Sequence, residues 1–249
     1  MVPILNRRNF LAAALSTTTG ARGTFNAGAQ PISAIAFDAL VLFDVSHVGR
    51  LAEELLPGTG ENLFREWRRR QFEYTWLRTI TRSYEDFWQI TNDSLTVAAE
   101  EIKVGLQPTH RRMLLDAYLD LRPWPDVVES ISTLKKAGLR LAILSNFTEW
   151  MLRRAELVSL FEPVLSTERA RTYKPDAAAY RLAVDALGLS RPSILFAAFA
   201  SWDAAGARTF GFPTVWVNRS RAPWDQLGEA PDYSTDSLAG LIAYVRTQR

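Results

Sequence analysis

Short apolar runs that alternate with helix-like segments are the feature of this chain that most restricts its fold. The runs are rich in Val, Ile, Leu, Phe and Ala, and their lengths are those of buried strands. They cover residues 32–43, 140–145, 164–166, 194–198 and 214–218. Strands that are apolar on both faces are typical of a parallel sheet covered by helices.

Helical patterns fill the gaps between the later runs. Gly138 and Gly188 stand where a helix would end, and Pro175 stands where one would begin. We predict helices over residues 124–137, 148–158 and 175–187. The β-α-β-α order predicts an α/β fold with a Rossmann-like parallel sheet, whose ligand site lies beyond the carboxyl ends of the strands.

Residues 47–121 interrupt this alternation after the first strand. Their apolar and aromatic positions recur at helical spacing and predict about four helices. We interpret this stretch as a helical cap, with the core domain formed by residues 30–46 and 122–249.

Composition narrows the function. The 29 Lys and Arg residues against 27 Asp and Glu residues give a net charge of +2, too close to neutral to indicate a nucleic-acid partner. The chain has no cysteine and only two histidines, His47 and His110, which argues against a cysteine nucleophile, a histidine triad or a multi-histidine metal site. We expect no metal, no cofactor and no membrane span.

The first 29 residues have the features of an export signal. Arg7 and Arg8 precede a short apolar stretch, and small residues stand at 27–29 before Gln30. This pattern resembles a twin-arginine signal and predicts a mature chain in the periplasm that begins near Gln30. The alternative is an ordinary amphipathic N-terminus, because threonines at 17–19 dilute the apolar stretch.

Asp38 lies inside the first apolar run, where a carboxylate has no packing role. Removing a carboxylate from water costs several kcal/mol unless the group is paired or its pKa rises. A nearby cation is therefore expected, and Asp38 is a candidate for chemistry at a strand end.

Several stretches together resemble the haloacid dehalogenase superfamily, and more closely its type II (L-2-haloacid) dehalogenases. The resemblance covers nearly all of the chain after the signal-like segment. It rests on "IAFDALVLFDVSHVGR", "EWRRRQFEYTWLR", "LRLAILSNFT", "TYKPDAAAY" and "ILFAAFASWDAAGARTFGFPTVWVNR".

The resemblance implies a covalent mechanism with no cofactor and a small 2-haloacid as the substrate. Asp38 would be the nucleophile that displaces halide from C2, and water would then hydrolyse the aspartyl ester. Lys174 would pair with Asp38, and Asp203 would order Lys174 and the hydrolytic water.

The resemblance also implies the binding residues. Arg68 and Asn146 would face the halide, and Ser145 would hold the substrate carboxylate, although a serine at a strand end is often a turn former. Phe87 and Trp202 would be apolar walls, with plain core packing as the alternative. The remaining implied residue is Tyr180, a supporting tyrosine.

The chain also departs from the family pattern near Asp38. The loop between Asp38 and Asp44 is one residue shorter than the Tyr-Gly-Thr loop of the family. Other polar or small positions of the family are apolar here: Leu40, Val41, Phe147, Ala198 and Ala200. These changes raise the desolvation of the carboxylate and remove hydrogen-bond donors.

Three hypotheses follow. The first is a periplasmic 2-haloacid dehalogenase. Its aromatic cap leaves room for the interface of a homodimer. The second is a degenerate relative that binds a small carboxylate with little or no turnover. The third is a magnesium phosphatase, which would need a second carboxylate at the position of Leu40.

Overall fold

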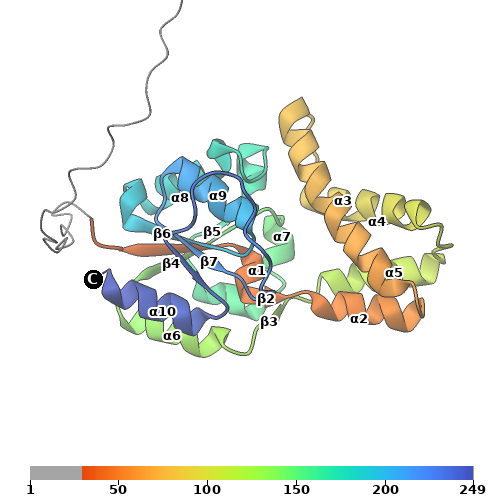
Figure 1. The fold of residues 1–249 in the computed structure, drawn as a ribbon, viewed down its shortest axis with the longest axis horizontal. Helices are drawn as coiled ribbons and strands as arrows, with labels where there is room; N and C mark the ends of the chain where they lie inside the picture. Colours follow the sequence, from red (N-terminus) through yellow and green to blue (C-terminus); the bar gives the residue numbers. More distant parts are fainter. Residues whose placement is uncertain (1–29, 249) are drawn as a thin grey trace, which may run out of the picture.

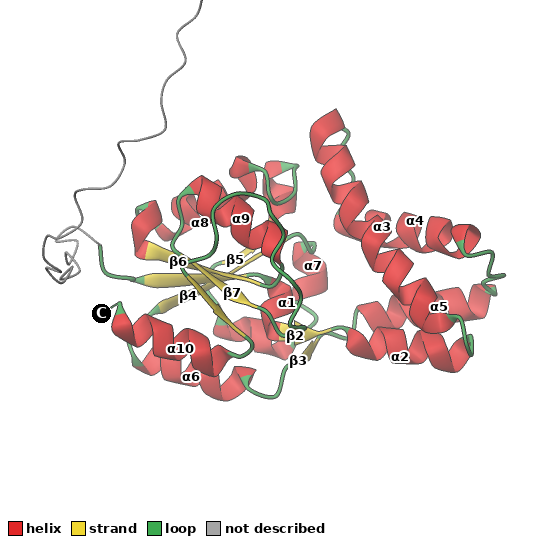
Figure 2. Cartoon of the chain, in the orientation of Figure 1, coloured by secondary structure: helices red, strands yellow, loops and turns green. Residues whose placement is uncertain are grey.

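A six-stranded parallel sheet forms the centre of the protein (Figures 1 and 2). The computed structural model describes residues 30–248. The strands, in spatial order, are β5 (Val164–Ser166), β4 (Arg140–Ser145), β1 (Ala34–Phe37), β6 (Ile194–Ala198), β7 (Thr214–Val217) and β8 (Tyr233–Thr235). The predicted α/β fold with a Rossmann-like parallel sheet is therefore confirmed.

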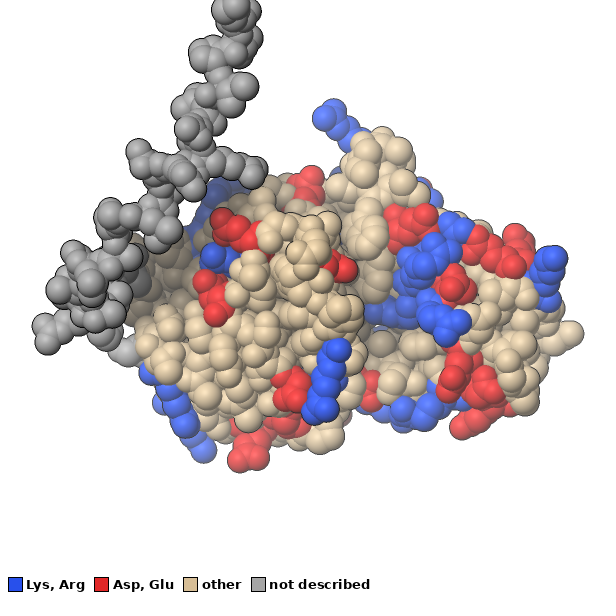
Figure 3. Space-filling view, in the orientation of Figure 1, with Lys and Arg blue, Asp and Glu red and all other residues tan. Residues whose placement is uncertain are grey.

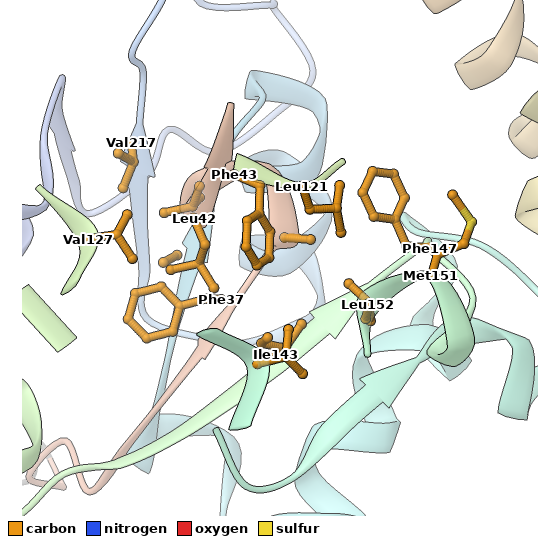
Figure 4. Packing of buried hydrophobic residues seen from close by; sticks show 14 of the residues in the cluster. Phe37, Leu42, Phe43, Leu121, Val127, Ile143, Phe147, Met151, Leu152 and Val217 are labelled. Atoms are coloured by element: carbon orange, nitrogen blue, oxygen red, sulfur yellow. The ribbon is translucent and has the colours of Figure 1, made fainter. Parts of the chain in front are cut away.

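Helices cover both faces of the sheet (Figure 1). On one face lie α6 (Val127–Lys136), α7 (Glu149–Leu152) and α10 (Leu238–Thr247), and on the other lie α8 (Ala177–Leu187) and α9 (Ser201–Phe210). Side chains of β1 alternate between the two cores. Ile35 and Phe37 join the first, and Ala34 and Ala36 join the second. Figure 4 shows Phe37 close to Ile143 and Leu42 in the first core.

The chain turns away from the sheet directly after β1. Asp38 caps the short helix α1 (Ala39–Leu42), and its Oδ1 accepts a hydrogen bond from the Leu40 amide at 2.7 Å. Strand β2 (Phe43–Asp44) then pairs antiparallel with β3 (Arg122–Pro123). The prediction of one strand over 32–43 was wrong, because a short apolar run does not distinguish a buried strand from a buried helix.

Other predicted boundaries also shift. Helix α6 begins at Val127 rather than at residue 124, and α8 begins at Ala177, where Asp176 caps it. The predicted helix 148–158 divides into α7 and a 3-10 helix, η1 (Glu156–Leu160). Two further 3-10 helices are η2 (Thr167–Ala170) and η3 (Arg191–Ser193). The sequence patterns did not indicate α9, β8 or α10.

Four helices form a second lobe, called the cap below, beside the sheet (Figure 1). They are α2 (Ser46–Leu55), α3 (Gly60–Thr81), α4 (Phe87–Glu101) and α5 (Pro108–Tyr118). Helix α3 buries one stripe at helical spacing, and this stripe contains Leu63, Trp67, Gln71 and Thr75. Apolar side chains of this lobe continue into the first core of the sheet domain.

Within residues 30–248, no helix is both long enough and apolar enough to cross a membrane. The predicted export signal, residues 1–29, lies outside the described residues.

Candidate active site

One lysine and two aspartates from three separate segments meet at the carboxyl end of the sheet. Asp38 follows β1, Asp203 lies in the first turn of α9 after β6, and Lys174 lies between η2 and α8. The Lys174 ammonium donates to Asp203 Oδ2 at 2.8 Å and also to Asp38 Oδ2. The fold thus brings together the three residues predicted to carry the chemistry.

Burial makes the electrostatics of this cluster strong. Lys174 and Asp203 are 0% exposed and Asp38 is 4% exposed. Burial opposes the charge of Lys174, but Asp203 and Asp38 together outweigh it, so the pKa of Lys174 lies above its usual value.

The pKa of Asp203 is raised, which disfavours the ionised form that pairs with Lys174. Burial raises this pKa to about 6, although Lys174 lowers it, and the nearby Asp38 charge adds to the rise. The two shifts are compatible because one ammonium faces two carboxylates. Lys174 gains from both anions, whereas Asp203 must share its cation with Asp38. We conclude that Lys174 is charged and that Asp203 takes up a proton at a higher pH than an ordinary aspartate does.

Tyr180 supports Asp203 from the side opposite Lys174. Its hydroxyl donates to Asp203 Oδ1 at 2.8 Å and lies 3.1 Å from the Asp203 carbonyl oxygen. Burial, followed by the charge of Asp203, raises the pKa of Tyr180 well above its usual value. The phenol therefore remains a hydrogen-bond donor throughout the range in which the enzyme would work.

Two polar residues lie where β4 ends. Ser145 Oγ accepts from the Phe147 amide at 3.1 Å. Asn146 Oδ1 accepts from the Lys174 amide at 3.1 Å and from Thr167 Oγ1 at 3.4 Å. The side-chain oxygen of Asn146 thus holds the segment that carries Lys174. The side-chain nitrogen of Asn146 is left to donate to a ligand.

Arg68 reaches from α3 into the space between the two lobes. Its Nη1 donates to Gln71 Oε1 at 2.6 Å and to the Tyr118 hydroxyl. The guanidinium carbon lies 4.5 Å from the ring centroid of Phe72, which is a cation–π distance. Arg68 is therefore held by neutral groups and an aromatic face.

The neighbouring arginines are held differently. Arg69 pairs with Glu66 at 2.7 Å, Arg70 pairs with Glu73 at 2.8 Å, and both pair with Glu101. The side chain of Arg69 is also 50% exposed. These arginines form a solvated, ion-paired face of the cap.

Aromatic side chains flank Arg68 on two sides. Trp202 lies 5.5 Å from Phe72, measured between ring centroids, and the Phe72 ring in turn stacks under Arg68. Phe87 lies 4.9 Å from Phe147, whose ring is 5.9 Å from that of Tyr118. Phe87 is fully buried and belongs to the core, whereas Trp202 is partly exposed.

A cavity of ≈ 260 Å³ opens between the cap and the core beside Arg68. Its walls include Leu40, Phe64, Trp124, Phe199 and Arg219. Figure 3 shows Lys and Arg side chains interspersed with Asp and Glu on the helical lobe where it faces the sheet domain. Arg68 and Arg219 place two cations in these walls against the single carboxylate of Asp44, a balance that suits a small organic anion.

The structure shows what surrounds three of the residues that depart from the family pattern: Phe147, Ala200 and Val41. Phe147 is buried between Phe87 and Tyr118, so it fills space beside the site. Ala200 is the N-cap of α9 and offers no side-chain hydrogen bond there. In the short loop, the Val41 carbonyl accepts from Arg219 at 3.1 Å, so this loop is anchored.

Sequence reasoning missed three residues near the site: Gln71, Tyr118 and Arg219. Gln71 occupies a core position of α3, four residues after Trp67 and four before Thr75, and a polar residue in such a stripe is a detectable signal. Tyr118 is one of the aromatic positions at helical spacing over residues 47–121, a pattern that does not reveal a polar role. Arg219 pairs with Asp126 at 2.9 Å, a partner that the sequence does not indicate. Within residues 30–248, no group of three or more His, Cys, Asp or Glu side chains is placed to hold a metal ion.

Fold and site together define a Rossmann-like α/β domain with a helical second lobe, in which an aspartate at the end of the first strand is paired to a buried lysine. Comparison with known proteins agrees with this class. Residues 32–211 match the haloacid dehalogenase-like hydrolase family. The chain belongs to this family, which confirms the superfamily that the sequence motifs indicated.

Individual relatives are similar over most of the chain. The (S)-2-haloacid dehalogenase of Pseudomonas sp. (strain YL) is 41% identical over 221 residues, which are 87% of this chain and 95% of that protein. A crystal structure of an L-2-haloacid dehalogenase has a TM-score of 0.84 and 37% identity, and the match covers 87% of this chain and all of that one. The L-2-haloacid dehalogenase from Xanthobacter autotrophicus with chloropropionic acid covalently bound has a TM-score of 0.78 and 32% identity, over 86% of this chain and 98% of that one.

Proposed function

We propose that this protein hydrolyses the carbon–halogen bond of short (S)-2-haloacids and releases 2-hydroxyacids through an aspartyl-ester intermediate. The observation that carries this proposal is the buried Lys174 ammonium, which contacts Asp38 and Asp203 at the end of β1. The similar proteins named above support it, because they are haloacid dehalogenases and one holds a covalently bound chloropropionic acid.

The first step is displacement at C2 of the substrate. A carboxylate oxygen of Asp38 forms a bond to C2 while the carbon–halogen bond breaks and the halide leaves with the bonding electrons. Lys174 and the Leu40 amide hold the Asp38 carboxylate, so its direction of attack is fixed before the substrate arrives. Arg68 provides the positive charge for the departing halide.

The second step is hydrolysis of the ester. A water molecule attacks the side-chain carbonyl carbon of Asp38 and loses one proton. The bond from that carbon to the substrate oxygen then breaks, that oxygen takes up the proton and leaves in the 2-hydroxyacid, and Asp38 returns to its carboxylate as the second proton passes to solvent. Asp203, when ionised, accepts the proton of the water, and Tyr180 and Lys174 hold Asp203 in place. Because C2 is attacked only once, its configuration inverts.

Halide release over a panel of 2-haloacids tests this proposal, with Asp38→Asn as the inactive control. Multiple turnovers in heavy-oxygen water should also place the label on Asp38, since water attacks the ester carbonyl rather than C2. Halide release without label on Asp38 would mean that water attacks the substrate directly. If Asp38→Asn leaves the release of halide unchanged, Asp38 is not the nucleophile.

Binding of a small carboxylate with little turnover is the second candidate. The apolar side chains of Ala198 and Ala200 favour it, because no polar side chain at these positions can steady the attacking water. Calorimetry with 2-chloropropionate and with its non-reactive analogue propionate separates the two candidates. Equal heats for both acids and no halide release would support binding alone.

We also propose export through the twin-arginine route and work in the periplasm. The support is in the sequence, where Arg7 and Arg8 precede an apolar stretch and small residues precede Gln30. Mass spectrometry of protein purified from the native cell envelope should find an N-terminus near Gln30. Protein that retains Met1 in the cytoplasm would contradict export.

We propose a homodimer as the assembled form. Apolar side chains on α3 support this, because Leu77 and Ile80 are 48% and 77% exposed. Light scattering during gel filtration should give a mass near twice that of the chain, and Ile80→Glu should shift the mass toward that of the monomer. A single-chain mass at every concentration would contradict the proposal.

A further inference from the structure

Three polar side chains from two cap helices meet at one point beside the cavity. Gln71 Oε1 accepts from Arg68 Nη1 at 2.6 Å and from the Tyr118 hydroxyl at 2.8 Å, and Arg68 Nη1 also contacts that hydroxyl. Gln71 and Tyr118 are both 0% exposed. The catalytic scheme above assigns no role to either residue, although each brings a polar group into the core.

The Gln71 amide is fixed from its other end. Its Nε2 donates to Thr91 Oγ1 at 2.6 Å, and Thr91 Oγ1 in turn donates to the Phe87 carbonyl at 2.6 Å. The indole of Trp67 donates to the Thr91 carbonyl at 2.7 Å. Since the amide nitrogen is used in this way, the Gln71 oxygen must point toward Arg68, and the orientation of the amide is determined.

Arg68 keeps its positive charge without an anionic partner. Among the residues of the described chain, no carboxylate lies within ion-pair distance of Arg68, whereas Arg69 and Arg70 each pair with glutamates. Neutral acceptors and the faces of Phe72 and Tyr118, at 4.5 and 5.8 Å, surround the guanidinium instead. A cation held in this manner retains its attraction for a mobile anion.

The Tyr118 hydroxyl connects Arg68 to the nucleophile electrostatically. Burial raises the pKa of Tyr118, Arg68 lowers it, and Asp38 raises it, so the phenol lies within the fields of both groups. The phenol stays protonated and donates to Gln71. Its oxygen is therefore free to accept from Arg68, which sets the direction of the guanidinium.

We propose that Gln71 and Tyr118 are positioning residues that hold the uncompensated Arg68 guanidinium where it receives the halide leaving from C2. This inference rests on the proposed dehalogenase function. Neutral acceptors are required at both positions, because a carboxylate would hold Arg68 equally well but would neutralise it and compete with the halide. The network therefore predicts weaker halide binding when Gln71 becomes charged.

Two variants test the network. Tyr118→Phe removes only the hydroxyl and keeps the ring contacts with Trp67 and Phe147. Gln71→Glu keeps an acceptor oxygen and adds a negative charge beside Arg68. Tyr244→Phe on α10 is the matched control, because Tyr244 stacks on Tyr233 and takes no part in the site. The readouts are kcat, KM, product inhibition by bromide, bromide binding followed by tryptophan fluorescence, and thermal unfolding.

We expect Tyr118→Phe to lower kcat and weaken bromide binding by about five- to tenfold each, as the loss of one ordinary hydrogen bond would do. The KM for 2-chloropropionate should change less than about twofold, because Ser145 rather than Arg68 is assigned to the carboxylate of the substrate. Gln71→Glu should weaken bromide binding by more than about tenfold, since the new carboxylate pairs with Arg68. Its Tm reports how far this pair offsets the lost hydrogen bond from Gln71 Nε2 to Thr91 Oγ1. Tyr244→Phe should match the parent in kcat and in bromide binding.

The outcomes separate this inference from the proposed function. If the parent releases no halide from any 2-haloacid but binds bromide, and both variants weaken that binding, the network is supported and the dehalogenase function fails. If the parent is active and neither variant changes bromide binding or kcat, the positioning role is overturned. Gln71→Glu with unchanged bromide binding would overturn the charge argument, and a parent that neither binds bromide nor releases halide would overturn both proposals.

Discussion

Lys174 Nζ lies 2.8 Å from Asp203 Oδ2 while it also contacts Asp38, so that a single buried cation serves two buried carboxylates. The cluster carries a net negative charge when both aspartates are ionised. This arrangement gives the site an acid form, in which Asp203 holds a proton, and a base form, in which Asp203 accepts hydrogen bonds from both Lys174 and Tyr180. Its properties should therefore depend on pH.

Halide release should rise with pH through an apparent pKa of about 6. Burial raises the pKa of Asp203 to about 6, so below that pH Asp203 is protonated and cannot take a proton from the hydrolytic water. The apparent value belongs to the coupled cluster rather than to Asp203 alone. The check is kcat for 2-chloropropionate between about pH 4.5 and 8, and a limb centred near the ordinary aspartate pKa of about 4 would contradict the assignment. Asp203→Asn should remove the limb from whatever activity remains.

Lys174→Met should destabilise the protein by about 3–5 kcal/mol, because it leaves Asp38 and Asp203 buried without a cation. The loss should be larger at pH 8 than at pH 5, since protonation of Asp203 at the lower pH relieves the repulsion. Urea unfolding at both pH values measures the effect. The double variant Lys174→Met/Asp203→Asn should recover part of the loss at pH 8, and equal losses at both pH values would show that the carboxylates do not cause the instability.

Gly206→Ala should lower kcat strongly, while the higher helix propensity of alanine limits the loss of stability. A Cβ at residue 206 would lie 2.6 Å from the Tyr180 hydroxyl and 2.5 Å from Pro175 Cβ, so Tyr180 must move away from Asp203. The higher helix propensity of alanine in α9 offsets this cost by about 1 kcal/mol. We expect kcat to fall by at least about tenfold, as expected when a group that positions an acid–base residue is displaced. Activity equal to that of the parent would mean that Tyr180 does not act through Asp203.

Ala198→Ser combined with Ala200→Asn should restore polar groups beside Asp203. Ala200 is the N-cap of α9 with φ −120° and ψ 153°, a conformation in which asparagine accepts from the first turn of the helix. The cap should raise the unfolding free energy by about 1 kcal/mol. The new hydroxyl and amide should increase halide release by about tenfold or more if missing donors limit the reaction. A stabilised variant with no gain in activity would mean that the apolar side chains suit a different substrate.

Much of the fold is predictable from local patterns. The apolar runs indicated β4, β5, β6 and β7, because a strand buried on both faces needs an unbroken apolar segment of the right length. The helical spacing between residues 47 and 121 likewise indicated the four helices of the second lobe. The first strand was too long in the prediction, since the side chain of Asp38 begins a helix where hydrophobicity continues.

What the sequence by itself determined is the kind of residue present at each strand end, including a carboxylate in an apolar run that requires a partner. Only the tertiary structure decided the partners. Asp38 and Lys174 are 136 positions apart, and Arg68 and Tyr118 are 50 apart, yet each pair is in direct contact. The physical reason is that hydrophobic periodicity depends on residues that are near one another in the sequence. Hydrogen bonds and the pKa shifts of buried charges depend instead on groups that lie within a few ångströms of one another in space. Those distances exist only after the sheet and the cap have placed remote segments side by side.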